Sequence, residues 1–162
     1  RRCHLPLRGR NPTAPAPPSG YEVPTMTHPY RIIAHTADTG IETRGGTLAE
    51  AIGNAAFAMF DLMYDLSSVP STMKITFDST ADSPPDLLVD VLSELLLRSE
   101  TDGVVFTEFR IQETAAGATV EAAGVSVGEQ ELQGPPIKAV TYHCLRCRQT
   151  GAGWEIRVIF DV

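Results

Sequence analysis

The stretch from residue 44 to residue 65 changes the hydrophobic period of the chain from two to nearly four, and this limits the possible folds more than any other feature. Apolar side chains recur there at the spacing of one helical face, at Leu48, Ile52, Ala55, Met59 and Met63. Thr47 and Glu50 form a capping box directly before them, which satisfies free N–H groups at the start of a helix. The stretch therefore predicts a capped amphipathic helix.

A second segment, SPPDLLVDVLSELLLRSETDG at residues 83–103, carries the same signals. Ser83 is a good cap, Pro84 suits the first helical position, and Gly103 suits the end of the helix. The apolar residues again share one face, at Leu88, Leu92, Leu95 and Leu96. We expect a second amphipathic helix.

Most of the remaining sequence alternates apolar and polar residues, which is typical of strands with one buried face. Residues 36–40, TADTG, supply turn chemistry between the first two of these segments. Strands are predicted over residues 30–35, 40–44, 72–78, 104–112, 118–127, 138–148 and 154–160. Two amphipathic helices packed on a largely antiparallel or mixed β-sheet make an α+β domain, and 162 residues suffice for one.

Residues 1–25 are rich in proline and arginine and lack hydrophobic periodicity. We therefore expect a disordered tail, followed by a domain over residues 26–162. The tail lacks the apolar core of a secretory signal, and no stretch of the chain reaches the ~18 apolar residues of a membrane helix. Three cysteines cannot all pair, which argues against a disulfide framework. A cytoplasmic protein without a membrane contact is expected.

The expected domain is acidic, with nine basic and nineteen acidic residues. Such a domain repels phosphate backbones unless its few cations gather on one face, so we expect no tight, direct binding of nucleic acid. A basic protein partner is easier to accommodate. Asp86, Asp90 and Glu94 lie at helical spacing, with Arg98 placed to pair with Glu94. This acidic row is either a solvated face or a docking surface for a partner.

Few residues indicate catalysis. His35 and His143 lie in predicted strands, and neither accompanies a nucleophile elbow, which argues against a hydrolase triad. Cys144 and Cys147 are three residues apart on a strand, so their side chains point to opposite faces, and no second pair of ligands follows at zinc-site spacing. We expect two half-buried thiols rather than a metal site.

The last segment, WEIRVIFDV, is more informative because it alternates apolar and polar residues up to the end of the sequence. The side chain of Asp161 and the α-carboxylate of Val162 place two negative groups within a few ångströms of each other. A divalent cation with oxygen ligands is the usual compensation for such a pair. Asp38, in the TADTG turn, is a candidate third ligand. The alternatives are that Asp38 caps its turn and that residues 161–162 form a plain surface end.

Five segments together resemble the archease family: HTADTGIE, TLAEAIGNAAFAMFDLMYD, LLVDVLSELLLRSE, IKAVTYH and RVIFDV. They occur in the family's order and extend over nearly all of residues 30–162. The resemblance implies a small cytosolic protein that acts on another enzyme. That partner is the GTP- and manganese-dependent RNA ligase that joins the exons of split tRNAs, and the family promotes guanylylation of the ligase's active-site histidine and restores multiple turnover.

The resemblance also implies a divalent cation, calcium above all, with manganese or magnesium as alternatives. Its ligands would be Asp38, Asp161 and Val162, and the domain would supply no nucleophile. Lys138, within IKAVTYH, would contact a ligase-bound phosphate or pair with a site carboxylate, or is an ordinary edge lysine. His35 and His143 are further candidate contacts to the partner or a phosphate. The segment from residue 124 to residue 137 looks shorter and less charged than the corresponding archease loop, which removes support for ligase contacts there.

Two other classes of function stay open. A metal-dependent hydrolase would use the same carboxylates with His35 or His143 as the general base. A chaperone-like interaction module would depend on the acidic row of the second helix and not on the carboxylates of the cation site.

Overall fold

The computed structural model describes residues 30–34, 39–66, 71–129 and 131–162, and it confirms the α+β class. The described strands form two separate antiparallel sheets rather than one. The first sheet has the order β1-β2-β7-β6 and consists of β1 (Tyr30–Ala34), β2 (Thr39–Gly45), β7 (Gly153–Asp161) and β6 (Ala139–Thr150). The second has the order β3-β5-β4 and consists of β3 (Met73–Thr80), β5 (Gly117–Ser126) and β4 (Val104–Thr114).

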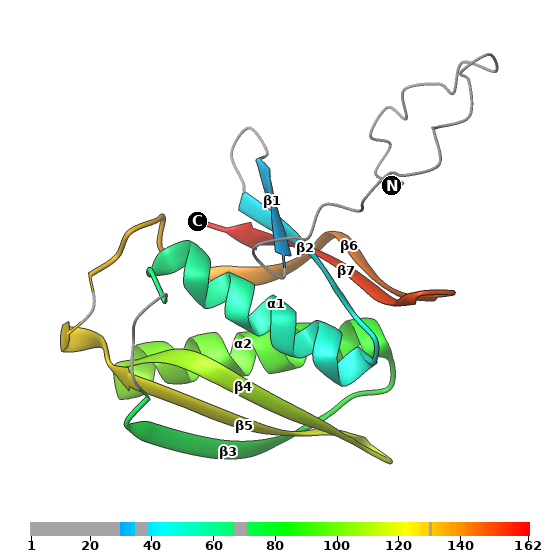
Figure 1. Cartoon of the computed structure of the whole chain (residues 1–162), viewed down its shortest axis with the longest axis horizontal. Helices are drawn as coiled ribbons and strands as arrows, with labels where there is room; N and C mark the ends of the chain where they lie inside the picture. The colour runs from blue at the N-terminus through cyan, green and yellow to red at the C-terminus, as the bar shows by residue number, and fades with distance from the viewer. Residues whose placement is uncertain (1–29, 35–38, 67–70, 130) are drawn as a thin grey trace, which may run out of the picture.

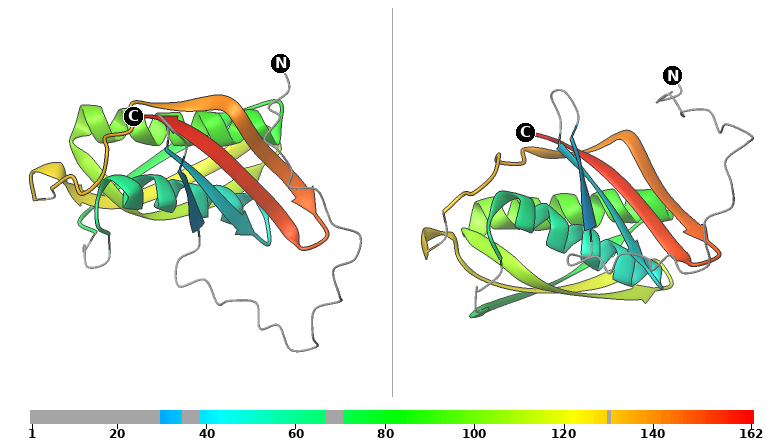
Figure 2. Two further views of the ribbon diagram at one scale, coloured as in Figure 1. Left: turned by 90° about the horizontal axis from the view of Figure 1, so that it is seen from above. Right: turned by 45° about the horizontal axis from the view of Figure 1, so that its top comes forward.

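The helices α1 (Leu48–Met63) and α2 (Pro84–Asp102) lie side by side between the two sheets (Figure 1). The right view of Figure 2 shows the same arrangement turned by 45°, and the left view looks down on the first sheet with the helices behind it. Helix α1 contacts β2 and β7 of the first sheet and β4 of the second, while α2 contacts β6 as well as β3 and β4. The first sheet therefore buries one face against the helices and keeps its other face on the outside.

Both predicted helices begin where their caps indicate, and the second also ends at its predicted glycine. The backbone N–H of Glu50 donates to Thr47 Oγ1 at 3.1 Å, and Glu50 Oε2 accepts from the N–H of Gly46 at 2.9 Å. Helix α2 is capped by Ser83, and Gly103 ends it in the left-handed conformation, with φ of 63°. The side chain of Ser83 accepts the N–H of Asp86, as expected of an N-cap.

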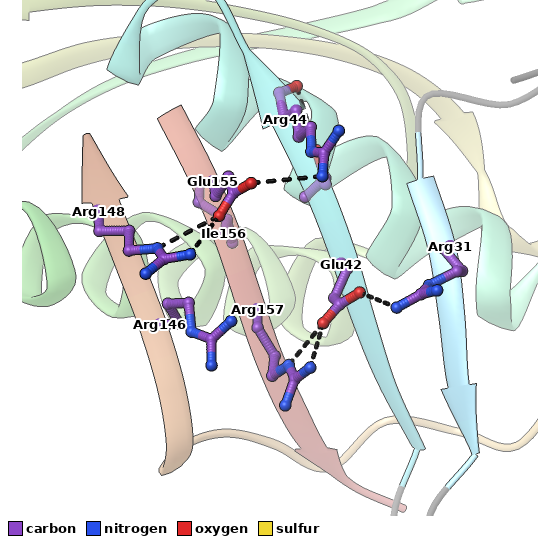
Figure 3. A pocket seen from close by; sticks show the side chains of 9 residues that line it. Arg31, Glu42, Arg44, Arg146, Arg148, Glu155, Ile156 and Arg157 are labelled. Carbon is purple, nitrogen blue, oxygen red and sulfur yellow. Dashed lines mark hydrogen bonds and ion pairs between the residues drawn. The ribbon is translucent and has the colours of Figure 1, made fainter. Parts of the chain in front are cut away.

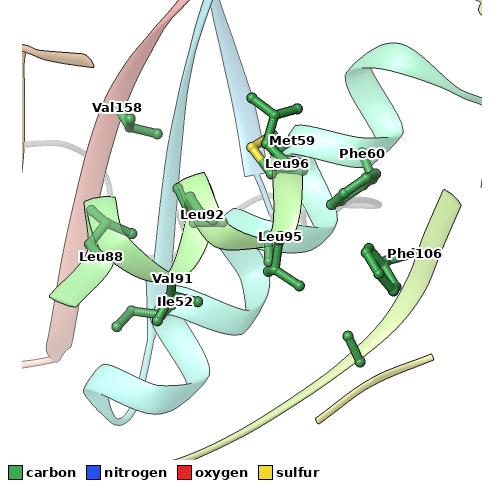
Figure 4. Packing of buried hydrophobic residues seen from close by; sticks show 14 of the residues in the cluster. Ile52, Met59, Phe60, Leu88, Val91, Leu92, Leu95, Leu96, Phe106 and Val158 are labelled. Atoms are coloured by element: carbon green, nitrogen blue, oxygen red, sulfur yellow. The ribbon is translucent and has the colours of Figure 1, made fainter. Parts of the chain in front are cut away.

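The apolar faces of both helices meet in one core (Figure 4). All five apolar positions predicted for α1 are buried, and Ala51, Ala56 and Phe60 are buried as well. Ala51, Ala56 and Phe60 are buried because a helix that lies between two sheets buries two of its sides. Phe60 packs edge-on against Phe106, with ring centroids 5.6 Å apart, and so joins α1 to the second sheet.

The strand predictions agree with the structure to within a few residues. One correction concerns Val127, which begins a short 3-10 helix (Val127–Glu129) and is not part of β5. In the segment that leads to β6, the N–H of Gln133 donates to the carbonyl oxygen of Met63 at 2.8 Å, and Ile137 is buried. This segment is therefore held against the end of α1. Residues 1–25, predicted as a tail, lie outside the described residues.

Candidate functional site at the end of strand β7

Asp161 ends β7, which lies between β2 and β6 in the first sheet. Its Cα partner on β6 is Ala139, and the N–H of Lys138 donates to the carbonyl oxygen of Asp161 at 2.8 Å. The preceding residue, Phe160, is fully buried, whereas the side chain of Asp161 is exposed. The phenylalanine thus anchors the end of the strand, and the carboxylate beside it is open to solvent.

The beginning of β2 lies against this same strand end, because Thr39 is the Cα partner of Phe160. The two predicted site residues before Thr39, His35 and Asp38, lie outside the described residues. Val162 is half-buried and packs against the core, which agrees with a strand end that belongs to the fold.

The residues present fit a hard cation in their chemistry. Carboxylate oxygen is the ligand that calcium, magnesium and manganese prefer, and Asp161 presents one such group. Within the described residues no three His, Cys, Asp or Glu side chains lie close enough together to hold a metal ion. Asp161 is therefore the one predicted side-chain ligand that the structure places.

The backbone hydrogen bond brings the main chain of Lys138 next to that of Asp161. The side chain of Lys138 is exposed and lines a shallow hollow of about 210 Å³ between α2 and β6. Leu97 and Glu100 of α2 form the opposite wall. The predicted contact residue and the predicted ligand are thus neighbours, although they are 23 positions apart in the sequence.

His143 is not brought to this strand end. It lies four residues beyond Ala139 along β6, roughly 13 Å at the rise of a β-strand. The β6–β7 register shifts between Thr141 and Arg146, and Cys144 within this interval has a φ of 52°. The imidazole of His143 is exposed, and its Nε2 lies 3.4 Å from Cys144 Sγ.

Cys147 is a half-buried free thiol, as predicted, and burial raises its pKa to about 11. Cys144 is not a free thiol, so the expectation of two such thiols is wrong for that residue. Because a thiol with a raised pKa is protonated near neutral pH, Cys147 is a poor nucleophile.

The acidic row of α2 has structural partners. Asp90 accepts a hydrogen bond from Ser79 Oγ of β3 at 2.5 Å, and Arg98 pairs with Glu94 at 2.7 Å, as predicted. Hydrogen bonds from Ser83 and then from Tyr142 hold the pKa of the Asp86 carboxyl below its usual value. Two of these contacts join α2 to neighbouring strands, so the row helps to attach the helix to both sheets.

The outer face of the first sheet carries a feature that the sequence analysis missed. A shallow groove of about 360 Å³ there is lined by charged side chains from all four strands (Figure 3). Five of them are arginines: Arg31, Arg44, Arg146, Arg148 and Arg157. They are more than half of the nine basic residues between positions 26 and 162. We call these five arginines, together with Glu42 and Glu155, the arginine face.

Each glutamate of the arginine face lies between arginines. Glu42 pairs with Arg31 and Arg157, and Glu155 pairs with Arg148 at 2.8 Å and with Arg44 at 3.3 Å. Burial favours a higher pKa for Glu42, but the hydrogen bonds from Arg157 and Arg31 outweigh it and lower the pKa. The pKa of Glu155 is lowered chiefly by its hydrogen bond from Arg148.

A signal for this face is present in the sequence. Charged residues alternate with other residues at Glu42 and Arg44, at Arg146 and Arg148, and at Glu155 and Arg157, so each pair lies on one side of its strand. What the sequence does not show is which strands are neighbours. The clustering follows from the register, which places the three pairs side by side.

Several known proteins that are similar to this chain in sequence belong to a single family. A family model described as the Archease protein family (MTH1598/TM1083) matches residues 30–162. A protein archease of Methanosarcina acetivorans is 36% identical over 146 residues, which cover 86% of this chain and 100% of that protein. One of Methanosarcina barkeri is 37% identical over 139 residues, which cover 82% of this chain and 95% of that protein.

Solved structures share the fold. The solution structure of Methanobacterium thermoautotrophicum protein 1598 matches with a TM-score of 0.67 at 28% identity, over 83% of this chain and 99% of that one. A crystal structure from Thermotoga maritima, described as an archease and possible chaperone, matches with a TM-score of 0.58 at 21% identity, over 80% and 94% of the two chains. At that identity the second match supports the fold alone.

Proposed function

Because the chain belongs to the archease family, we propose that it activates a GTP-dependent RNA ligase that joins the exons of split tRNAs. In this role it promotes guanylylation of the ligase's active-site histidine and restores multiple turnover. The protein acts in the cytoplasm, on a protein partner, and is not itself an enzyme. No described helix is long and apolar enough to cross a membrane.

The observation that carries the proposal is the position of the Asp161 carboxylate. It is exposed at the end of a buried strand, beside the N–H of Lys138 and next to the residue that pairs with Thr39. Asp38, the second proposed ligand, directly precedes Thr39 in the sequence, and Thr39 is the first residue of β2. Asp38, Asp161 and the backbone oxygens of Val162 would hold a divalent cation, with calcium, manganese and magnesium all suited to oxygen ligands.

A bound divalent cation would neutralise phosphate charge on GTP as the ligase histidine is guanylylated. The residues of this chain would bind the cation and orient the phosphates. Asp161 offers carboxylate oxygens, and Lys138, whose side chain lines the hollow between α2 and β6, would contact a phosphate or pair with a site carboxylate. The hydrogen bond between their backbones keeps the two groups at one end of the sheet.

The described residues favour an activator over a hydrolase. The candidate base His143 lies far along β6 from Asp161, and the Cys147 thiol is half-buried with a raised pKa. Neither group can reach a substrate held at the end of β7. His35, the other candidate base, lies outside the described residues.

The test measures transfer of labelled GMP to purified ligase, with and without this protein, at saturating GTP and divalent cation. We expect stimulation by the wild-type chain and its near-complete loss with Asp161→Asn, because the substitution removes a charged oxygen ligand without changing the size of the side chain. Asp82→Asn is the matched control, since Asp82 is an exposed aspartate of the loop before α2. Calorimetric titration with calcium should show the same difference between the two variants.

Each outcome decides between the classes of function. Full stimulation by Asp161→Asn contradicts the cation site, and no stimulation by the wild-type chain contradicts the activator role. Hydrolysis of a phosphoester by the chain alone would favour the hydrolase. Prevention of ligase aggregation without any gain in guanylylation would favour a chaperone-like module, and Asp90→Lys/Glu94→Lys would then be the variant that loses function.

A further inference from the structure

The arginine face is built from two charged rows that cross the first sheet. One row runs Arg31, Glu42, Arg157 and Arg146 over β1, β2, β7 and β6, because these residues are successive Cα partners. The second row runs Arg44, Glu155 and Arg148 over β2, β7 and β6. The two rows are about 7 Å apart, the distance of two residues along a strand. The face carries three positive charges in excess.

The ion pairs within the face do not neutralise all of its positive charge. The side chains of Arg31, Arg44 and Arg148 are 69%, 77% and 59% exposed, although each contacts a glutamate. Arg146 is exposed and has no ion-pair partner among the described residues. A guanidinium has five N–H donors, so most N–H donors of the face take no part in the described ion pairs.

Arg146 also lies directly opposite Arg157. Like charges in that position destabilise a sheet, and the two neighbouring glutamates offset the repulsion only in part, because Glu42 pairs with Arg157 while Glu155 attracts Arg146 without forming an ion pair with it. An anion between or above the two guanidinium groups would remove the repulsion. Arg146, which has no ion-pair partner among the described residues, is therefore able to bind an added anion.

The shape and lining of the face limit the kind of anion. The groove is open, and its two uncharged lining residues, Thr43 and Ile156, are buried beneath the charged rows. A small-molecule pocket encloses its ligand with apolar walls, and glutamate, unlike arginine, is depleted at protein interfaces. A phosphate backbone needs no enclosing apolar wall, since it is held by guanidinium and hydroxyl donors.

We propose that the arginine face contacts the phosphate backbone of an RNA strand. Phosphates would lie along the two rows and between Arg146 and Arg157. The contact is independent of sequence, because the groove is lined by no aromatic side chain among the described residues on which a base could stack. Asp161 lies on the same side of β7 as Glu155 and Arg157, roughly 13 Å beyond Arg157. The identity of the RNA as the substrate of the partner ligase rests on the proposed function.

The test is a titration of a fluorescent single-stranded oligoribonucleotide with the purified chain, followed by anisotropy. It contains neither ligase nor GTP, so its result does not depend on the activator role. We expect weak binding, with a Kd of about 10⁻⁴ to 10⁻⁶ M at physiological salt, and a slope of log K against log salt of about −2 for three neutralised phosphates. The double variant Arg146→Glu/Arg148→Glu should bind at least about tenfold more weakly, since the face changes from +3 to −1.

The matched control is Lys74→Glu/Arg110→Glu, which changes the net charge by the same amount on two exposed residues of the second sheet. It should retain nearly full RNA binding. Equal losses in both double variants would mean that only net charge matters and would overturn the proposal, as would the absence of any binding by the wild-type chain. Stronger binding of polyglutamate than of RNA would overturn it too and would assign the face to an acidic protein instead.

A single variant guards against a folding defect. Arg146→Ala removes no described ion pair, so the fold should be retained, as far-ultraviolet circular dichroism can confirm. The salt slope should fall by about 0.7, the value of one phosphate contact on a single strand. An unchanged affinity and slope for this variant would also overturn the proposal.

Discussion

Arg146 and Arg157 are direct cross-strand partners on β6 and β7. Arg157 forms an ion pair with Glu42 on β2, and the side chain of Arg157 is only 18% exposed. Arg146 lies at the outer strand of the sheet, in solvent. The two residues therefore differ in what they do for the fold, although they have the same chemistry and the same register position.

The first prediction follows from this difference. Arg146→Ala should leave the free energy of unfolding unchanged or raise it by up to about 0.5 kcal/mol, because it removes a like-charge neighbour. Arg157→Ala should lower it by about 1 kcal/mol, because Glu42 loses a half-buried partner. Urea unfolding at neutral pH and low salt measures both changes. A larger loss for Arg146→Ala than for Arg157→Ala would contradict this assignment.

The second prediction concerns acid stability. The pKa of Glu42 is lower in the folded chain than in the unfolded one, so its carboxylate stabilises the fold above the unfolded pKa of about 4.3. This stabilisation is lost as the pH falls through the folded pKa. Glu42→Gln should therefore lower stability at pH 7 and lose less stability than the wild type between about pH 5 and pH 3.

Urea midpoints measured across that range would show the difference. Glu121→Gln is a suitable control, since Glu121 is an exposed strand residue of the other sheet. Identical pH profiles for wild type and Glu42→Gln would show that the two arginines do not shift this carboxyl.

Local signals in the sequence predicted the elements of the fold well. Ser83 and Gly103 correctly predicted the start and the end of α2, because an N-cap and a left-handed glycine contact only backbone groups within one helical turn. The division into two sheets could not be read in the same way. Strand β7 pairs with β2, over a hundred residues away, and alternation tells which face of a strand is buried but not which strand lies beside it.

The same limit applies to the candidate site. The alternating pattern of β7 puts Phe160 and Asp161 on opposite faces of the strand, and the structure buries Phe160 and exposes Asp161. The neighbourhood of Lys138 and Asp161 depends on the β6–β7 register, which no local pattern encodes. The arginine face was missed for this reason, since its charges gather only when four strands are placed in order.

The third prediction tests the core. Leu92 is fully buried between the helices and the sheets, so Leu92→Ala should cost about 2–5 kcal/mol of unfolding free energy through lost burial and the cavity left behind. Leu97→Ala, on the same helix, is the control because Leu97 is 53% exposed. It should change stability by less than about 0.5 kcal/mol. Similar losses for both variants would mean that α2 does not pack as described.

The fourth prediction contrasts two glycines. Gly153 begins β7 with a φ of 118°, and a Cβ there would lie 2.3 Å from the carbonyl oxygen of Gly45. Because that oxygen belongs to the backbone of β2, it cannot move aside without breaking the β2–β7 pairing. Gly153→Ala should therefore cost about 1–3 kcal/mol. Gly53 lies inside α1, where an added methyl group would meet no atom within 4 Å outside the helix's own backbone, so Gly53→Ala should stabilise the fold by about 0.5–1 kcal/mol. Opposite shifts of the urea midpoint would confirm both positions, and a stabilising Gly153→Ala would contradict the register of β2 with β7.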